Sequence, residues 1–305
     1  MRLDDFDPNI NVEDQRGSGG GGGGGFGGGG GLLMGLLPMI GSRFGCGGIV
    51  VVLILMAVFG GMGGLGGLLG GGQSSAPTTQ NGAPRAGTNT TSSCTLTPES
   101  KEACNAFSSA DNTWEAIFQK NGQRFEAPKL VFYDGNGRSG CGEAQSAMGP
   151  FYCPTDQGIY LDTSFFAELS NRFKADGDFA RDYVIAHEFG HHIQKLLGTN
   201  AQVQQAQRQA SETEGNALSV RLELQADCYA GVWAAANRSR LEPGDIQEGM
   251  TAAQAIGDDT LQRESQGRVV PDSFTHGTSA QRQAWLKRGL DSGDPAQCDT
   301  FSGAI

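Results

Sequence analysis

The sequence predicts a domain of the α+β class, preceded by one transmembrane helix. Short runs typical of strands, separated by strong turn signals, occupy the middle of the chain, whereas the pattern from Phe165 onward is mostly helical. Strands and helices in separate parts of a chain are typical of α+β folds rather than of alternating α/β folds. The predicted domain, residues 98–305, is long enough to bury a substantial core.

The front of the chain is predicted to lie outside this domain. Residues 1–45 are expected to form a disordered tail, because Gly17 to Gly31 is almost entirely glycine and cannot bury enough apolar surface to fold. Residues 46–70 carry no charge, include the apolar run from Ile49 to Phe59, and are long enough to cross a bilayer as a helix. Residues 71–97 are rich in Ser, Thr, Pro and Gly, which predicts a flexible linker.

The apolar segment is predicted to be a single-pass anchor in the inner membrane. The 45 residues ahead of it disfavour a cleaved signal peptide, and the Gly-rich tracts beside it disfavour a buried core helix. Arg43 is the nearest flanking charge, and Arg2 and Arg16 lie on the same side of the segment. The positive-inside rule therefore places the N-terminus in the cytoplasm and the large C-terminal region in the periplasm or outside the cell.

The cysteines agree with this location. Six of them follow the predicted span, and an even number in one domain fits an oxidising compartment with as many as three disulfides. The pairings to test first are Cys94–Cys104, Cys141–Cys153 and, by remainder, Cys228–Cys298. The other connectivities of six cysteines stay open, and a second metal site is disfavoured because no two cysteines are spaced C-x-x-C.

The first part of the domain predicts one helix and a small antiparallel sheet. Residues 113–118 are expected to be helical, and residues 130–133 form an apolar run typical of a strand. The Asp-Gly-Asn-Gly sequence at 134–137 is a strong turn signal. Residues 151–153 and 158–162 indicate a hairpin ahead of the next long helix.

That next helix carries the sequence His187-Glu188-Phe189-Gly190-His191. Residues four apart share a helix face, so the two histidines can bind one metal ion. Glu188 projects beside that face, where a carboxylate can take a proton from water that the metal activates. This H-E-x-x-H arrangement is typical of zinc metallopeptidases; the alternative is a solvated helix with two incidental histidines.

A catalytic zinc ion normally takes a third protein ligand. Glu223 and Asp227 lie four apart in a second helical stretch, so both face the same way. We expect Glu223 to be the third ligand and Asp227 to accept a hydrogen bond from a ligand histidine, which fixes the tautomer of that histidine. Glu212 and Glu214 are rival ligands, although they stand in a polar stretch. A charged outer helix face is the alternative for the whole group.

The two motifs, HExxH at 187–191 and ExxAD at 223–227, resemble those of the glutamate-type zincins, and most closely those of the bacterial neutral zinc metallopeptidase family. That family is similar to this chain in its charged N-terminus, Gly-rich segment, single membrane span, and a catalytic region containing HEFGHH and ELQADCYAG. The similarity covers most of the chain. It implies a zincin-like metallopeptidase fold, in which an edge strand ahead of the active-site helix binds the peptide in extended form. The predicted strands at 151–153 and 158–162 are the candidates for that role.

Three further residues near the motifs carry predictions. Gly190 would weaken an ordinary helix by about 1 kcal/mol relative to Ala, which is explained if another element packs closely against the metal site. His192 points about 100° away from His191, so it cannot bind the same metal and is expected at the surface or in support of the ligands. His276 is the candidate donor to the oxyanion that forms during peptide hydrolysis; the alternative is a histidine in an N-capping loop.

Charge limits the partners. The net charge is −11 and no Lys/Arg-rich tract occurs, which disfavours nucleic-acid binding. Two functions remain. The first is a membrane-anchored zinc peptidase, whose partners are peptide or protein substrates. The second is a non-catalytic envelope protein that uses a zincin scaffold to bind partners. Glu188 beside both histidines favours the first, because zinc binding alone does not require a base there.

Overall fold

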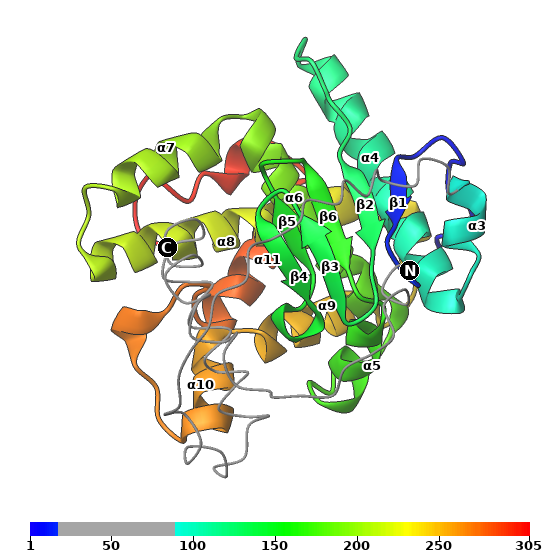
Figure 1. Cartoon of the computed structure of the whole chain (residues 1–305). Helices are drawn as coiled ribbons and strands as arrows, with labels where there is room; N and C mark the ends of the chain where they lie inside the picture. Colours follow the sequence, from blue (N-terminus) through cyan, green and yellow to red (C-terminus); the bar gives the residue numbers. More distant parts are fainter. Residues whose placement is uncertain (18–88) are drawn as a thin grey trace, which may run out of the picture.

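The computed structural model describes residues 1–17 and 89–305 (Figure 1). Its main sheet has four strands in the order β1-β2-β6-β5. The strands of this sheet are β1 (Val12–Asp14), β2 (Lys129–Phe132), β5 (Phe151–Cys153) and β6 (Gly158–Leu161). A second, two-stranded antiparallel sheet consists of β3 (Asn136–Ser139) and β4 (Gly142–Gln145).

The main sheet is mixed, so the prediction of a purely antiparallel sheet is wrong. The predicted hairpin is present, because β5 pairs antiparallel with β6. However, β1, β2 and β6 all run parallel. The chain leaves β2, passes through the β3–β4 hairpin and β5, and then enters β6 in the direction of β2. Nothing local in the sequence marks such a return.

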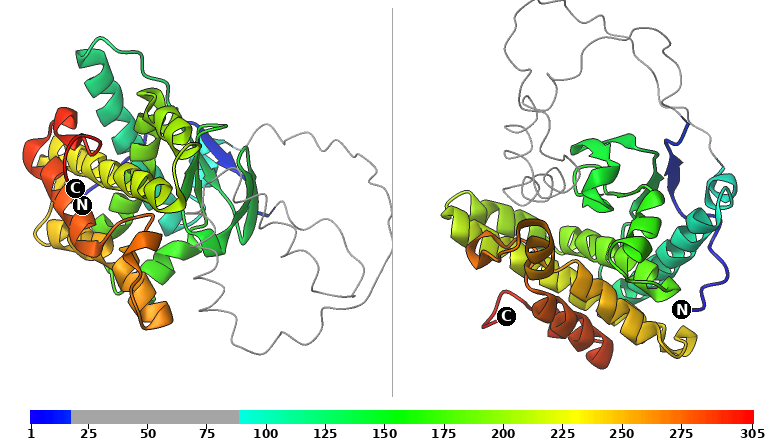
Figure 2. Two further views of the ribbon diagram at one scale, coloured as in Figure 1. Left: turned by 90° about the vertical axis from the view of Figure 1, so that its left-hand side faces the viewer. Right: turned by 90° about the horizontal axis from the view of Figure 1, so that it is seen from below.

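Helices are the other main elements of the described chain, which agrees with the α+β class. They are α3 (Thr90–Cys94), α4 (Pro98–Lys120), α5 (Ser164–Asn171), α6 (Asp178–Leu196), α7 (Thr199–Gln207), α8 (Glu212–Ala236), α9 (Asp245–Ala255), α10 (Asp258–Gln266) and α11 (Ser279–Ser292). Seen from below, the sheet lies on one side of the helices (Figure 2). Within residues 1–17 and 89–305, no helix has both the length and the hydropathy of a membrane span.

Helix α6 lies at the centre of the fold. It packs against α4, α8 and α9, and its residues include fourteen that are buried, among them Tyr183, Ile185 and Phe189. The helix ends at Leu196, and Gly198, two residues later, has a left-handed φ of 80° that side chains rarely adopt. Because α6 is buried on nearly all sides, the polar groups that it carries face other parts of the protein rather than bulk water.

Helices α8 and α11 touch backbone to backbone. A Cβ atom at Gly289 would overlap the carbonyl oxygen of Cys228, and one at Gly231 would overlap that of Leu286. Two glycines therefore permit a crossing that larger residues would block. The crossing brings polar side chains of α11 within reach of the face of α8 that points toward α6.

The prediction that residues 1–17 belong to a disordered tail is wrong. Val12–Asp14 pairs with β2, and Met1, Leu3 and Ile10 are buried in the main core. The prediction failed because these few apolar residues are scattered among charged ones and adjoin the glycine tract.

The predicted linker also ends earlier than expected. Thr90–Cys94 is helical, and Cys94 is fully buried and bonded to Cys104. The Ser/Thr composition of this stretch suggested a tether, yet Asn89 caps the helix through its side chain. The predicted span at 46–70 and most of the linker lie outside the described residues.

The three predicted disulfides are present. Cys94 bonds Cys104, Cys141 bonds Cys153, and Cys228 bonds Cys298. The last of these ties α8 to the C-terminal segment, 70 residues away.

Candidate metal centre

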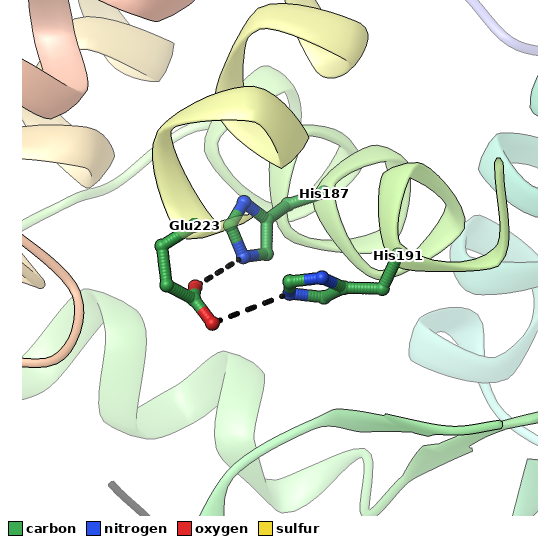
Figure 3. A group of neighbouring side chains, drawn as sticks. All are labelled: His187, His191 and Glu223. Carbon is green, nitrogen blue, oxygen red and sulfur yellow. Dashed lines mark hydrogen bonds and ion pairs between the residues drawn. The ribbon is translucent and has the colours of Figure 1, made fainter. Parts of the chain in front are cut away.

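The predicted ligands converge from two helices. His187 and His191 stand on α6, Glu223 stands on α8, and each offers a ligand atom within 4.8 Å of the others (Figure 3). Nε2 of His187 is 3.1 Å from one Glu223 oxygen, and Nε2 of His191 is 3.6 Å from the other. The helical spacing of the sequence thus brings together the three donors that it predicted.

Each ligand histidine is oriented through its other ring nitrogen. Nδ1 of His187 lies 2.8 Å from Oδ1 of Asp227, and Nδ1 of His191 lies 2.9 Å from the side-chain oxygen of Gln194. Since both acceptors take a proton from Nδ1, each ring in its neutral form carries a lone pair on Nε2 that faces the Glu223 carboxylate. Lone pairs and a carboxylate repel one another unless a cation lies among them. The donor set therefore fits a divalent metal ion, and two imidazoles with one carboxylate suit zinc.

The electrostatics of the three residues point the same way. Burial opposes charge on Glu223, but His191, His276 and His187 hold the pKa of its carboxyl well below the usual range. Burial likewise opposes charge on His191, but Glu223 and other neighbours raise the pKa of His191 to about 9. Without a metal, the raised pKa of His191 corresponds to an imidazolium that pairs with the Glu223 anion, and a divalent cation would displace its Nε2 proton.

Asp227 is part of a buried network that the sequence did not reveal. Arg282 of α11 donates Nε to Oδ2 and Nη2 to Oδ1 of Asp227, both at 2.9 Å. Tyr183 donates its hydroxyl to Oδ1 at 2.6 Å. Burial favours the neutral acid, but Arg282 and His187 lower the pKa of Asp227 to about 2. Asp227 is therefore an anion held from three sides, and it fixes the ring of His187.

Rival ligands are excluded by position. Glu214 is exposed and closes a capping box with Ser211 at the start of α8, and Glu212 is exposed in the same first turn. Both lie more than two helical turns from Glu223 along α8. Their role is to complement the helix N-terminus rather than to bind metal.

Glu188 lies next to the ligands and is only 8% exposed. In the described part of the chain its carboxylate makes no hydrogen bond or ion pair. Burial raises the pKa of Glu188, a shift that His191 and His187 partly offset. A buried carboxylate that is not committed to another group is available to exchange a proton.

His276 lies within electrostatic reach of the ligands, in the loop ahead of α11. Burial opposes its charge, but Glu223 and Asp258 raise the pKa of His276. Nδ1 is 3.0 Å from the hydroxyl of Thr275 and 3.4 Å from Oδ1 of Asp258. Asp258 also accepts hydrogen bonds from the backbone N–H groups of the loop at Thr275, His276 and Gly277. This one carboxylate fixes both the loop and the imidazole.

His192 contacts groups away from the candidate ligands, as predicted. Of the two positions predicted for it, the surface is wrong, because the residue is fully buried. Nε2 donates to the carbonyl oxygen of Glu126 at 2.7 Å, and Nδ1 accepts from the hydroxyl of Tyr152 at 3.0 Å. Burial lowers the pKa of His192 to about 4, so the ring is neutral. His192 joins α6 to β5, the edge strand of the sheet, and so fixes that strand beside the site.

The close approach expected at Gly190 is also present. A Cβ atom there would lie 3.0 Å from both Cα and the carbonyl oxygen of Ala226. Glycine therefore lets α6 and α8 approach at the level of the ligands, which explains a glycine in the middle of this helix.

Comparisons with known proteins agree with the motif. The family model described as "Putative neutral zinc metallopeptidase" matches residues 1–301. The chain is 59% identical over 197 residues to "Uncharacterized protein YpfJ" of Escherichia coli K12, a match that covers 64% of this chain and 69% of the relative. It is 43% identical over 206 residues to "Uncharacterized protein Rv2575" of Mycobacterium tuberculosis H37Rv, which covers 63% of this chain and 69% of the relative. No solved structure matches it.

Proposed function

Since the chain belongs to the family of putative neutral zinc metallopeptidases, we propose that it is a zinc-dependent endopeptidase with a zincin-like active site. The observation that carries the proposal is the convergence of His187, His191 and Glu223 beside Glu188. Three ligands leave a coordination position for a reactant, which is typical of catalytic rather than structural zinc sites. When bound there, zinc would polarise the scissile carbonyl group and increase the acidity of the attacking water.

Glu188 is the proposed general base. Its carboxylate takes a proton from water while the water oxygen bonds to the carbonyl carbon, and it then gives the proton to the amide nitrogen as the C–N bond breaks. The raised pKa of Glu188, caused by burial, suits a group that must both accept and return a proton. Proton balance is complete within this residue, the water and the peptide.

Two other elements are proposed to position the substrate. His276, with Nδ1 engaged by Thr275 and Asp258, keeps Nε2 for donation to the developing oxyanion. Strand β5 is the edge strand that His192 fixes beside α6, and it offers backbone groups to an extended peptide. Backbone pairing of this kind gives affinity with little dependence on side chains, so we expect broad sequence tolerance.

The proposed location of the domain is outside the cytoplasm. Three disulfides in one domain persist in an oxidising compartment, whereas cytoplasmic thiols are kept reduced. Attachment to the inner membrane through residues 46–70 stays a prediction from the sequence. The second candidate function, a non-catalytic envelope protein, is disfavoured by the uncommitted carboxylate of Glu188.

The test compares the wild type with Glu188→Gln and with the exposed control Glu212→Gln. We expect one zinc per chain in all three proteins, and chelator-sensitive cleavage of a dye-labelled unfolded protein by the wild type and the control. Glu188→Gln should keep the zinc and lose about 10²–10⁴-fold in kcat. If Glu188→Gln retained both zinc and full cleavage, the catalytic assignment would fail. Zinc binding without cleavage by the wild type would favour the second candidate function, a non-catalytic binding protein.

The role of His276 has its own test. An unchanged kcat in His276→Ala would show that His276 does not stabilise the oxyanion.

A further inference from the structure

Residues 1–17 contain β1, the strand at one edge of the main sheet. In β1, Val12 pairs with Leu130 and Asp14 with Phe132. Backbone hydrogen bonds continue beyond the strand, from the N–H of Leu130 to Asn11 at 2.9 Å and from the N–H of Gln15 to Phe132 at 2.8 Å. The residues of β2 from Leu130 to Phe132 are fully buried, and β1 covers the edge of β2 opposite β6. Without β1, that edge would expose a row of unpaired backbone groups.

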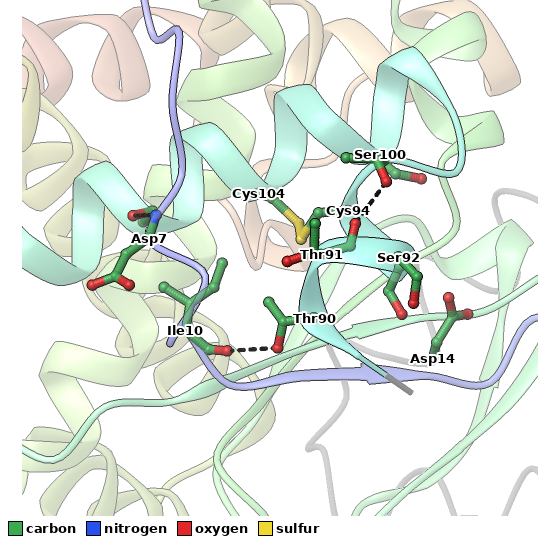
Figure 4. Close-up of a disulfide and its surroundings, with 12 residues drawn as sticks. Asp7, Ile10, Asp14, Thr90, Thr91, Ser92, Cys94, Ser100 and Cys104 are labelled. Atoms are coloured by element: carbon green, nitrogen blue, oxygen red, sulfur yellow. Dashed lines mark hydrogen bonds between the residues drawn. A yellow bond between two sulfur atoms is a disulfide. The ribbon is translucent and has the colours of Figure 1, made fainter. Parts of the chain in front are cut away.

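The same segment fills part of the hydrophobic core. Met1, Leu3 and Ile10 are 3%, 9% and 7% exposed and belong to the core cluster that also includes α4 and α6 residues. The segment runs along α3 and α4 beside the Cys94–Cys104 disulfide, where the hydroxyl of Thr90 donates to the carbonyl oxygen of Ile10 at 3.2 Å (Figure 4). These contacts join residues on both sides of the stretch 18–88.

Charged groups at the two ends of the segment are buried with partners from the domain. Arg16 is 6% exposed; it pairs with Asp14 at 2.6 Å, donates to the Ser93 carbonyl oxygen at 2.8 Å, and lies over the Phe132 ring. At the other end, the Met1 ammonium pairs with Asp178 at 2.6 Å and with Asp245 at 3.2 Å.

Met1 contacts the same helix, α6, that carries the two histidines of the candidate metal centre. Asp178 is the first residue of this helix, which carries the two histidine ligands, and Asp245 is the first residue of α9, which packs against it. Asp178 and Asp245 also lie close to the carboxylate of Glu248, and together the three form an acidic cluster. One positive charge of the chain thus lies against two of these three carboxylates, and the N-terminal segment contacts the first residue of the helix that carries the two histidines.

From these contacts we propose that residues 1–17 are a structural part of the metallopeptidase domain and lie in the same compartment as its active site. A strand that closes a sheet cannot lie across a membrane from that sheet. Gly17 and Asn89 are therefore on the same side of any membrane. This replaces both the cytoplasmic N-terminus expected from the flanking arginines and the single membrane crossing predicted between these two residues. The family model, whose match begins at residue 1, is consistent with a segment that belongs to the domain.

Cysteine labelling in cells tests the placement in the full-length protein. Asn9→Cys and Ala116→Cys each place a thiol at an exposed position, the first in the N-terminal segment and the second on α4. Both are made with Cys46→Ser, so that the six remaining cysteines are those paired in disulfides. A membrane-impermeant maleimide is applied to spheroplasts and to lysed spheroplasts.

We expect both thiols to react to the same extent before and after lysis. Labelling of Ala116→Cys in intact spheroplasts, with Asn9→Cys labelled only after lysis, would overturn the proposal. If both thiols reacted only after lysis, the shared compartment would be supported, and the proposed location of the peptidase outside the cytoplasm would be wrong. No outcome depends on peptide cleavage, so the two proposals fail independently.

A stability measurement tests the packing directly. Ile10→Asp places a carboxylate in the core and should lower the melting temperature of the purified full-length protein by roughly 5–15 °C. Asn11→Asp adds the same charge one residue later, at an exposed position, and should leave the melting temperature within about 2 °C of the wild type. Equal melting temperatures for the two variants would show that the segment is not packed in the core.

Discussion

Arg282 gives the sharpest test of how the metal centre is held. Its side chain is 2% exposed, that of Asp227 is 0% exposed, and two N–H groups contact the carboxylate at 2.9 Å. The variant Arg282→Met keeps most of the volume of the side chain but leaves the Asp227 charge buried with only neutral donors. Removing one member of a buried ion pair costs about 3–5 kcal/mol. For a domain of this size, that corresponds to a fall in the melting temperature of roughly 6–20 °C.

The double variant Asp227→Asn with Arg282→Met separates the cost of a stranded charge from the loss of contacts. Because neither charge remains, we expect it to regain at least half of the stability that Arg282→Met loses. Differential scanning calorimetry on the zinc-free proteins gives these values. The exposed control Lys287→Met, whose partner Asp291 is equally exposed, should change stability by less than about 0.5 kcal/mol.

Zinc affinity should respond differently from stability in the same proteins. Both Asp227→Asn and the double variant lose the carboxylate that orients His187, so each should bind zinc about 10–100-fold more weakly than the wild type. Titration against a competing chelator measures this. If Arg282→Met melted within about 2 °C of the wild type, or if the double variant bound zinc normally, the argument for this network would be refuted.

Three further predictions concern packing, pH and the redox state. Gly190→Ala should destabilise the protein by about 1–3 kcal/mol, since the new methyl group meets the α8 backbone at 3.0 Å. The helical control Gly215→Ala, whose methyl group would make only an ordinary contact with Gln207 at 4.0 Å, should stabilise by up to about 1 kcal/mol; chemical denaturation distinguishes them. Burial, together with nearby carboxylates, raises the pKa of Asp111 to about 6, so ionisation costs stability as pH rises from about 4 to 6. Asp111→Asn should accordingly stabilise the protein by about 1–3 kcal/mol at pH 8, and equal gains at pH 4 and pH 8 would contradict this. Removing the Cys228–Cys298 disulfide, which closes a loop of 70 residues, should cost about 2–4 kcal/mol, measured from melting curves of the Cys→Ala pair.

The sequence predicted those parts of the site that depend on helical spacing. His187 and His191 are four apart, as are Glu223 and Asp227, and regular α-helices turn such pairs to one face. The convergence of the three candidate ligands therefore followed from two short motifs. The disulfide pairing was also predicted, because two of the pairs are local and the third was left by remainder.

Residues whose role comes from distant contacts could not be predicted. Arg282 reaches Asp227 only because two glycines let α11 cross α8 in backbone contact, and no pattern near Arg282 marks it as buried. The first 17 residues presented the same difficulty: β1 has only three residues, and its partner strand follows more than 100 positions later. The composition beside the glycine tract predicted disorder for residues 1–17, whereas contacts with distant parts of the chain order them.

The order in which the ligands occur along the chain has a consequence for assembly. His187 and Glu223 are 36 residues apart, with only α7 between their helices, whereas Glu13 and Lys129, which mark the pairing of β1 with β2, are 116 apart. Loop closure for the ligand pair costs about 1 kcal/mol less than closure for the strand pair. Contacts that are close in sequence also form faster. The two helices can consequently pack together while the N-terminal strand is still unpaired, so the candidate ligands can meet before the last strand joins the sheet.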